Sequence, residues 1–144
     1  MTPHFVYTLD AANPYARLLL NLSAGQGQPL HAGLVPHQPF LLLGHGEACH
    51  PLCRWGRQQA HCIGAMLLNP GLHYPADTPL PFPSLVIHAD SNDGSQRLSA
   101  SVMQAEQWGS AFARLPALPQ AEAALQHWLA QLLTLQRHWP SGDF

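Results

Sequence analysis

Three continuous apolar segments dominate the middle of this 144-residue chain. They read FLLL at 40–43, IGAMLL at 63–68 and LVI at 85–87, the last within the predicted strand SLVIH at 84–88. A strand that is apolar along its whole length must be covered on both faces, because neither set of its alternating side chains suits water. Segments with helical character alternate with these strands, which is typical of a parallel sheet between two helical layers. We therefore predict a three-layer α/β sandwich with a mostly parallel central sheet of about five strands.

The flanking sequence predicts the remaining elements. A first strand is expected at Phe5–Leu9 and a weak second strand at Leu30–Val35. Helices are expected over four segments: Tyr15–Leu22, Cys49–Gln59, Arg97–Phe112 and Ala121–His138. The segment Asn69–Pro83 holds five prolines and is predicted to be a loop, because proline cannot donate a backbone hydrogen bond. With no internal repeat and an ordinary domain length, residues 1–144 are predicted to form a single domain.

The chain is poor in charge, which restricts its partners. Only 10% of its residues are charged, lysine is absent and the net charge is −2. Nucleic-acid binding is disfavoured, because neutralising phosphates requires several clustered cations. A surface with so few charges exposes neutral polar and apolar groups, and this favours self-association. We expect the partner to be a second copy of the chain, as a homodimer, or another protein.

The sequence also gives expectations about location and cofactors. No apolar run approaches the roughly 18–20 residues that span a bilayer, so no membrane partner is expected. The first residues, MTPHFVYTLD, lack the basic and long apolar segments of a secretory signal. The three cysteines are an odd number, which argues against a disulfide framework. We expect a cytoplasmic protein without a cofactor.

Three motifs carry a resemblance to a known family. They are FLLLGHGEA from Phe40, IGAMLLNPG from Ile63, and PLPFPSLVIHADSND followed by a helix that ends QAEQWGSAF. Their order resembles the α/β-hydrolase fold, and more narrowly the small bacterial serine hydrolases of the YdeN type. The third motif is the most specific, since its proline spacing and Trp108-Gly109 extend over about thirty residues. The resemblance covers Phe40 to about Leu115 and implies a trimmed α/β-hydrolase-like fold.

The resemblance also implies where a catalytic triad would stand. The family displays its serine in the turn G-x-S-x-G between a strand and a helix, and a histidine base and an acid complete the triad. Here Gly46 occupies the nucleophile position, and Asp93 matches the acid as a vestigial triad member. The segment Leu115–Gln120, where the histidine is due, contains none, and His127 falls within a helical pattern. Losing the nucleophile alone typically lowers the rate by about 10⁶-fold.

Glycine suits the backbone of this sharp strand-to-helix turn, which is called an elbow and displays its middle residue. The elbow residue is strained, and glycine relieves such strain because it adopts positive φ without a steric penalty. We therefore predict a positive φ at Gly46 and a helix that starts near Ala48.

Other residues near the elbow are weaker candidates for chemistry. His45 and Glu47 flank Gly46 and would supply a base and a carboxylate. Cys49 lies almost one helical turn beyond Gly46, although a small buried thiol is its ordinary role. A weak metal-ligand set consists of Cys49, Cys53, His61 and Cys62, since thiolate and imidazole bind zinc. The cysteine spacing differs from that of the usual zinc knuckle, and the ordinary role is packing for the cysteines and surface exposure for the histidine.

Two functional hypotheses follow from the sequence. The first is a non-catalytic, degenerate hydrolase-like domain that binds a protein or itself. The second is a small serine-hydrolase-like esterase that uses atypical residues. Under the first hypothesis, the expected contact surfaces are the strand Leu30–Val35 and the exposed side of the helix Ala121–His138, where Leu135 and Trp139 add apolar surface.

Overall fold

A parallel sheet forms the centre of the protein. The computed structural model describes residues 4–10, 12–72, 78–90 and 98–138, with side chains up to residue 134. The described sheet has the order β2-β1-β3-β4-β5-β6, and every neighbouring pair is parallel. Its strands are β1 (His4–Thr8), β2 (Gly27–Pro29), β3 (Phe40–His45), β4 (Cys62–Leu68), β5 (Ser84–His88) and β6 (Ala111–Arg114). The predicted three-layer α/β class is confirmed, with six strands instead of about five.

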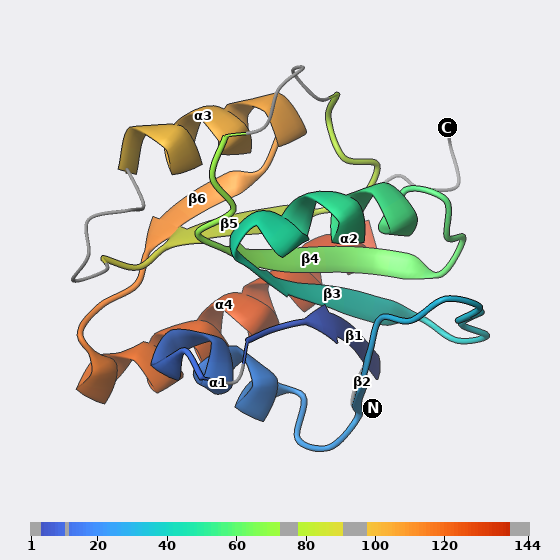
Figure 1. Cartoon of the computed structure of the whole chain (residues 1–144), viewed down its shortest axis with the longest axis horizontal. Helices are drawn as coiled ribbons and strands as arrows, with labels where there is room; N and C mark the ends of the chain where they lie inside the picture. Colours follow the sequence, from blue (N-terminus) through green and yellow to red (C-terminus); the bar gives the residue numbers. More distant parts are fainter. Residues whose placement is uncertain (1–3, 11, 73–77, 91–97, 139–144) are drawn as a thin grey trace.

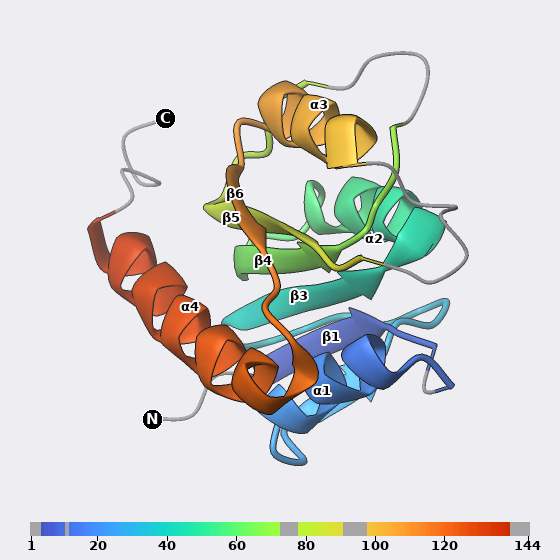
Figure 2. The same cartoon turned by 90° about the vertical axis from the view of Figure 1, so that its left-hand side faces the viewer.

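Helices cover both faces of the sheet (Figures 1 and 2). They are α1 (Pro14–Leu22), α2 (Cys49–Gly56), α3 (Leu98–Trp108) and α4 (Leu118–His138), and a 3₁₀ turn, η1 (Gly46–Ala48), precedes α2. The helices α2 and α3 lie on one face, and α1 and α4 lie on the other. The described helices include none that is long and apolar enough to cross a membrane.

The continuous apolar strands divide their side chains between two cores. In β3, Phe40 and Leu42 pack on the face that carries α2 and α3, whereas Leu41 and Leu43 pack on the face that carries α1 and α4. All four side chains are at most 1% exposed. This burial on both faces confirms that the 40–43 segment is a central strand, as its composition predicts.

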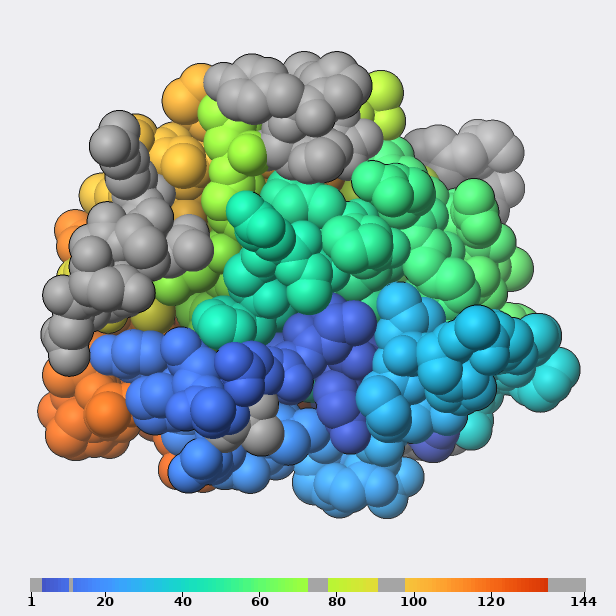
Figure 3. All heavy atoms as spheres, in the orientation of Figure 1, coloured from blue at the N-terminus to red at the C-terminus, as the bar shows by residue number. Residues whose placement is uncertain are grey.

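The predicted second strand at Leu30–Val35 is wrong. The strand is β2, at Gly27–Pro29, and residues 30–39 form a mostly exposed connection that is light blue in Figure 3. The Phe5 N–H donates to Gln26 O and the Leu30 N–H donates to Tyr7 O, at 3.1 and 3.0 Å. Backbone pairing with β1 therefore selects this strand, even though glycine, glutamine and proline have low strand propensity.

The predicted helix Arg97–Phe112 is too long, because its last residues form a strand. The helix α3 ends at Trp108, and Gly109 follows with φ +67°. A glycine in this conformation ends a helix, and the Ser110 N–H donates to Ala105 O at 2.9 Å to close the last turn. The chain then continues as β6 beside β5. Smaller differences are that α2 ends at Gly56 and that α4 begins at Leu118.

The order of the strands reverses beside β3. From β1 the chain passes to β2 on one side and then to β3 on the other. Because all described strands are parallel, their carboxyl ends share one edge of the sheet. In open α/β sheets, ligand sites form at this edge where the strand order reverses. The elbow sequence that follows β3 lies at this position.

Candidate functional site

An elbow-like turn ends the central strand β3. Gly46 follows His45 with φ +67°, the 3₁₀ turn η1 begins at Gly46, and α2 begins at Cys49. The predicted positive φ is confirmed, and so is a helical start near Ala48. A Cβ placed on Gly46 would meet no atom within 4 Å among the described residues. The position therefore faces open space, as a displayed residue requires, but glycine has no side chain to react.

The other glycine of the GHG sequence has a packing role. A Cβ on Gly44 would lie 2.9 Å from Cys49 Sγ and 3.0 Å from Leu52 Cδ2. Both side chains are fully buried in the core on the α2 side of the sheet. Glycine at 44 therefore allows α2 to approach the strand closely, whereas glycine at 46 allows the backbone to turn.

His45 is the titratable group nearest to the elbow position along the strand. Its side chain is half-buried, and burial lowers its pKa, while the Asp10 carboxylate acts more weakly in the opposite direction. A lowered pKa keeps the imidazole neutral near pH 7, so it can accept a proton. Glu47 is exposed, and within the described residues no hydrogen bond joins its carboxylate to His45. The two candidates flank Gly46 without forming a dyad.

The candidate cysteines are not activated as nucleophiles. Cys49 and Cys53 are fully buried, and the Cys49 thiol donates to Leu68 O at 4.0 Å. Burial raises the pKa of the Cys49 thiol, and burial also raises the pKa of Cys62 to about 12. Because the thiolate is the reactive form, both thiols are inert at neutral pH.

The weak metal-ligand set is not brought together as a site. His61 is exposed at the start of β4, whereas Cys49 and Cys53 lie in the core under α2. In the described part of the chain, no group of three or more histidine, cysteine, aspartate or glutamate residues is placed to hold a metal ion.

A serine–histidine–aspartate arrangement lies elsewhere, where α3 meets the end of β5, and sequence reasoning missed it. His88 Nδ1 is 3.5 Å from Ser101 Oγ, and His88 Nε2 is 3.2 Å from Asp90 Oδ1. Arg114 also donates to Asp90, at 3.4 Å. The strand alternation places His88 on the α3 face, like Val86, but no sequence pattern identifies Ser101 as its partner.

This arrangement has the residues of a triad in an unreactive orientation. Ser101 is fully buried and His88 is 2% exposed, whereas the Asp90 side chain is 77% exposed. A triad requires the opposite, with an accessible serine and a buried acid that orients the histidine. The Ser101 hydroxyl cannot reach a substrate, so the network serves to hold α3 on β5.

A small hollow lies at the carboxyl edge of the sheet. Asn69 follows β4 with φ +48°, and its amide donates to Ala89 O at 2.9 Å and accepts from Ala89 N–H at 2.8 Å. This pair joins the ends of β4 and β5 beside a hollow of about 290 Å³, which Tyr15, Asp90 and Leu118 also line. The volume is at the lower limit for small-molecule pockets.

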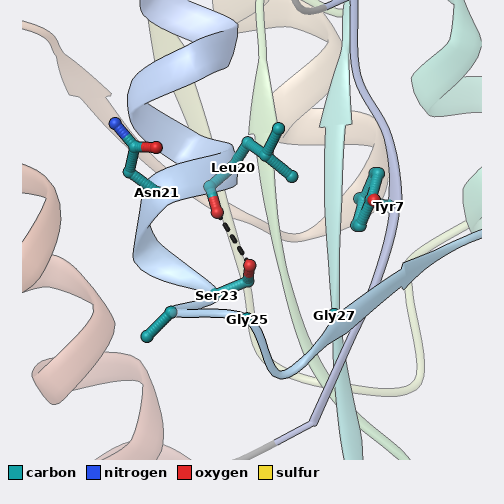
Figure 4. Close-up of a pocket in the computed structure, with 7 residues that line it drawn as sticks. Tyr7, Leu20, Asn21, Ser23, Gly25 and Gly27 are labelled. Atoms are coloured by element: carbon teal, nitrogen blue, oxygen red, sulfur yellow. Dashed lines mark hydrogen bonds between the residues drawn. The ribbon is translucent and has the colours of Figure 1, made fainter.

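A second hollow, of about 300 Å³, lies where α1 ends beside β1 and β2 (Figure 4). Tyr7, Leu20 and Gly27 line it, and Ser23 donates from its hydroxyl to Leu20 O at 2.7 Å. Its described lining contains no carboxylate, imidazole or thiol.

A third hollow, of about 500 Å³, follows the outer side of α4 and is lined by His127, Ala130, Gln131 and Thr134. His127 therefore lies on the exposed side of its helix and not on the sheet side. The side chains of Leu135 and Trp139, which the sequence singles out as apolar surface, lie outside the described residues.

Asp93, which the sequence resemblance implies as the triad acid, also lies outside the described residues. The Leu115–Gln120 segment, where the resemblance would place a histidine, leads from β6 into the first turn of α4. No family model, curated protein or solved structure matches this chain. Its function therefore has to be inferred from its own residues.

Proposed function

We propose that this chain is a degenerate α/β-hydrolase-like domain that acts by binding a protein, itself included, and not by catalysis. Gly46 is the observation that carries the proposal. It stands at the end of the central strand, beside the reversal of strand order, in a turn that displays its middle residue. That residue lacks the side chain that nucleophilic catalysis requires.

The surroundings of Gly46 support this proposal. The thiol nearest to the elbow, at Cys49, is buried with a raised pKa. The serine that contacts a histidine, Ser101, is buried on the sheet side of α3. None of these groups can take the place of the missing serine at an open position.

Binding is supported by the surface. The chain has only 14 charged side chains, six basic and eight acidic. So few charges do little to prevent the association of exposed apolar surfaces. Val35, Met103 and Leu118 are large apolar residues that are 64%, 47% and 47% exposed. We also propose a cytoplasmic location in a bacterial cell, because the three cysteines are free thiols and the sequence resemblance is to bacterial proteins.

A weak hydrolase activity is the second candidate. It would use His45 as a general base that activates water for the hydrolysis of an activated ester. The observation in its favour is that burial lowers the pKa of His45, which keeps the imidazole neutral beside the open position. The Asp10 carboxylate acts on this imidazole through its charge, but within the described residues no carboxylate is hydrogen-bonded to it, which is why we favour the binding function.

An activity-based fluorophosphonate probe and a p-nitrophenyl acetate assay distinguish the two candidates. Under the binding function, the wild-type chain is unlabelled and hydrolyses the ester at the buffer rate. Ser101→Ala is the matched control, because it removes the serine that contacts a histidine. Labelling that Ser101→Ala abolishes, or hydrolysis that His45→Gln abolishes, would establish an enzyme and overturn the proposal.

A further inference from the structure

The two edges of the sheet differ in what they offer to another strand. At β2, the Gln26 carbonyl and the Leu30 N–H bond to β1. The backbone N–H and C=O of one residue point to the same side of a strand, and those of the next residue point to the opposite side. The backbone groups of Gly27 and Pro29 therefore point away from β1. Proline has no N–H, so this three-residue edge presents a single donor. Short edge strands and prolines are the usual protection against edge-to-edge pairing.

The opposite edge, at β6, is also short, at four residues, but no proline blocks its outward N–H groups. The Leu115 N–H donates to His88 O at 2.8 Å, so the same alternation directs Ala111 and Ala113 toward β5. Phe112 and Arg114 then present both N–H and C=O outward. The strand contains no proline, lysine or bulge, and its pairing with β5 is in regular register. Within the described residues, no loop or turn contributes a backbone hydrogen bond to these two residues.

We propose that β6 is the docking strand for a second copy of this chain, which adds its own β6 antiparallel across a twofold axis at Ala113. This inference rests on the proposed binding function and names its partner. In this register, Phe112 faces Arg114 of the partner subunit, and Arg114 faces Phe112 of the partner subunit. The outward groups of each facing pair exchange two hydrogen bonds, so four bonds join the two sheets.

The side chains of β6 are self-complementary in this register. Phe112 and Arg114 lie on the same face of the strand, so each guanidinium meets the ring of the opposite Phe112, a favourable cation–π pair. Asp90 of the same chain lies 3.4 Å from Arg114 and balances its charge, so the two arginines near the axis do not repel strongly. Ala113, on the axis, is small enough for the close approach of a pair without hydrogen bonds.

Proline substitution tests the edge directly. Arg114→Pro removes an outward N–H while leaving the bonds to β5 intact, and Arg114→Ala is the matched control that keeps the N–H. In sedimentation velocity at micromolar concentration, we expect a wild-type dimer. Arg114→Ala should weaken it by a few-fold, and Arg114→Pro should weaken it by at least tenfold with unchanged far-UV circular dichroism. A strictly monomeric wild type, or a folded Arg114→Pro chain that dimerises as tightly as wild type, overturns the inference.

Cysteine cross-linking is a second test that does not depend on proline being tolerated. Ala113→Cys places two thiols opposite each other on the axis, at a separation that a disulfide can join. Val35→Cys is the control, since Val35 is 64% exposed but lies in the connection after β2. With a mild oxidant, Ala113→Cys should form a covalent dimer and Val35→Cys should not. Equal cross-linking of the two variants, or none at Ala113, contradicts the register.

The outcomes separate this inference from the proposed function. A dimer that persists in Arg114→Pro shows self-association through another surface. This result contradicts the pairing of β6 edges but agrees with the proposed binding function. If the chain is a monomer and its β6 binds only an extended peptide of another protein, a second copy is not the partner. Probe labelling would refute the non-catalytic proposal while leaving the dimer test unaffected.

Discussion

The two glycines at the end of β3 should respond differently to the same substitution. A Cβ at Gly44 would lie 2.9 Å from Cys49 Sγ and 3.0 Å from Leu52 Cδ2, so Gly44→Ala overpacks the core. Overpacking of this kind costs about 1–3 kcal/mol of folding free energy. A Cβ at Gly46 meets no described atom, so Gly46→Ala costs only the strain of a positive φ, about 1–2 kcal/mol. We expect Gly44→Ala to be the more destabilising change.

A double-mutant cycle with Cys49→Ala separates the two causes. Removing Cys49 Sγ relieves the closest contact of the new methyl group, so Gly44→Ala and Cys49→Ala should couple favourably by at least about 0.5 kcal/mol. Gly46→Ala and Cys49→Ala should be additive within about 0.5 kcal/mol. Urea unfolding of the five variants and wild type measures these free energies. If the effects of Gly44→Ala and Cys49→Ala are additive, or those of Gly46→Ala and Cys49→Ala are coupled, the assigned roles are wrong. Those roles are packing for Gly44 and turn geometry for Gly46.

Substitutions at two further positions test groups at the carboxyl edge of the sheet. Burial lowers the pKa of folded His45 below its ordinary value of 6.5. At a pH just below 6.5 the unfolded chain therefore binds more protons than the folded chain. The free energy of unfolding then falls as the pH drops through this range. Urea unfolding of His45→Gln should therefore show a smaller loss of stability than wild type between about pH 7 and pH 5.5; an equal loss would assign the acid sensitivity elsewhere. Asn69→Ala leaves the N–H and C=O of buried Ala89 without their partner and should cost about 2–4 kcal/mol in thermal or urea unfolding. Asn69→Gly tolerates the φ of +48° and should be about 1 kcal/mol less destabilising than Asn69→Ala, whereas the reverse order would show that the backbone conformation is not limiting.

The sequence predicts the central elements because burial determines them. The FLLL segment has no polar face, so only a central strand fits it, and β3 is that strand. The GHG sequence likewise indicates a turn, and Gly46 has the expected positive φ. These features depend on local composition, which a sequence contains in full.

The edge strands could not be assigned in the same way. β2 consists of Gly27–Pro29, whose residues have low strand propensity and are held only by pairing with β1. β6 is short, and AFAR after a helix resembles the end of that helix. Gly109 was the available signal, since a glycine after a helical run commonly ends it.

The candidate site was predicted only in part. Gly46, His45 and Glu47 are adjacent in sequence, so their common position follows from the motif. The contact between His88 and Ser101 depends on how α3 lies on β5, and no local pattern encodes that placement. Because both side chains are buried, this contact does not imply catalysis.

Placing a serine at position 46 tests the proposed non-catalytic function most directly. The open space at position 46 should admit Gly46→Ser at the expense of about 1–2 kcal/mol of stability. Without a placed base, its hydroxyl stays protonated and unreactive. The account predicts that Gly46→Ser hydrolyses p-nitrophenyl acetate no faster than the wild-type chain. A rate at least tenfold above wild type, lost again in Gly46→Ser/His45→Gln, would show that a base is in place and would contradict the non-catalytic assignment.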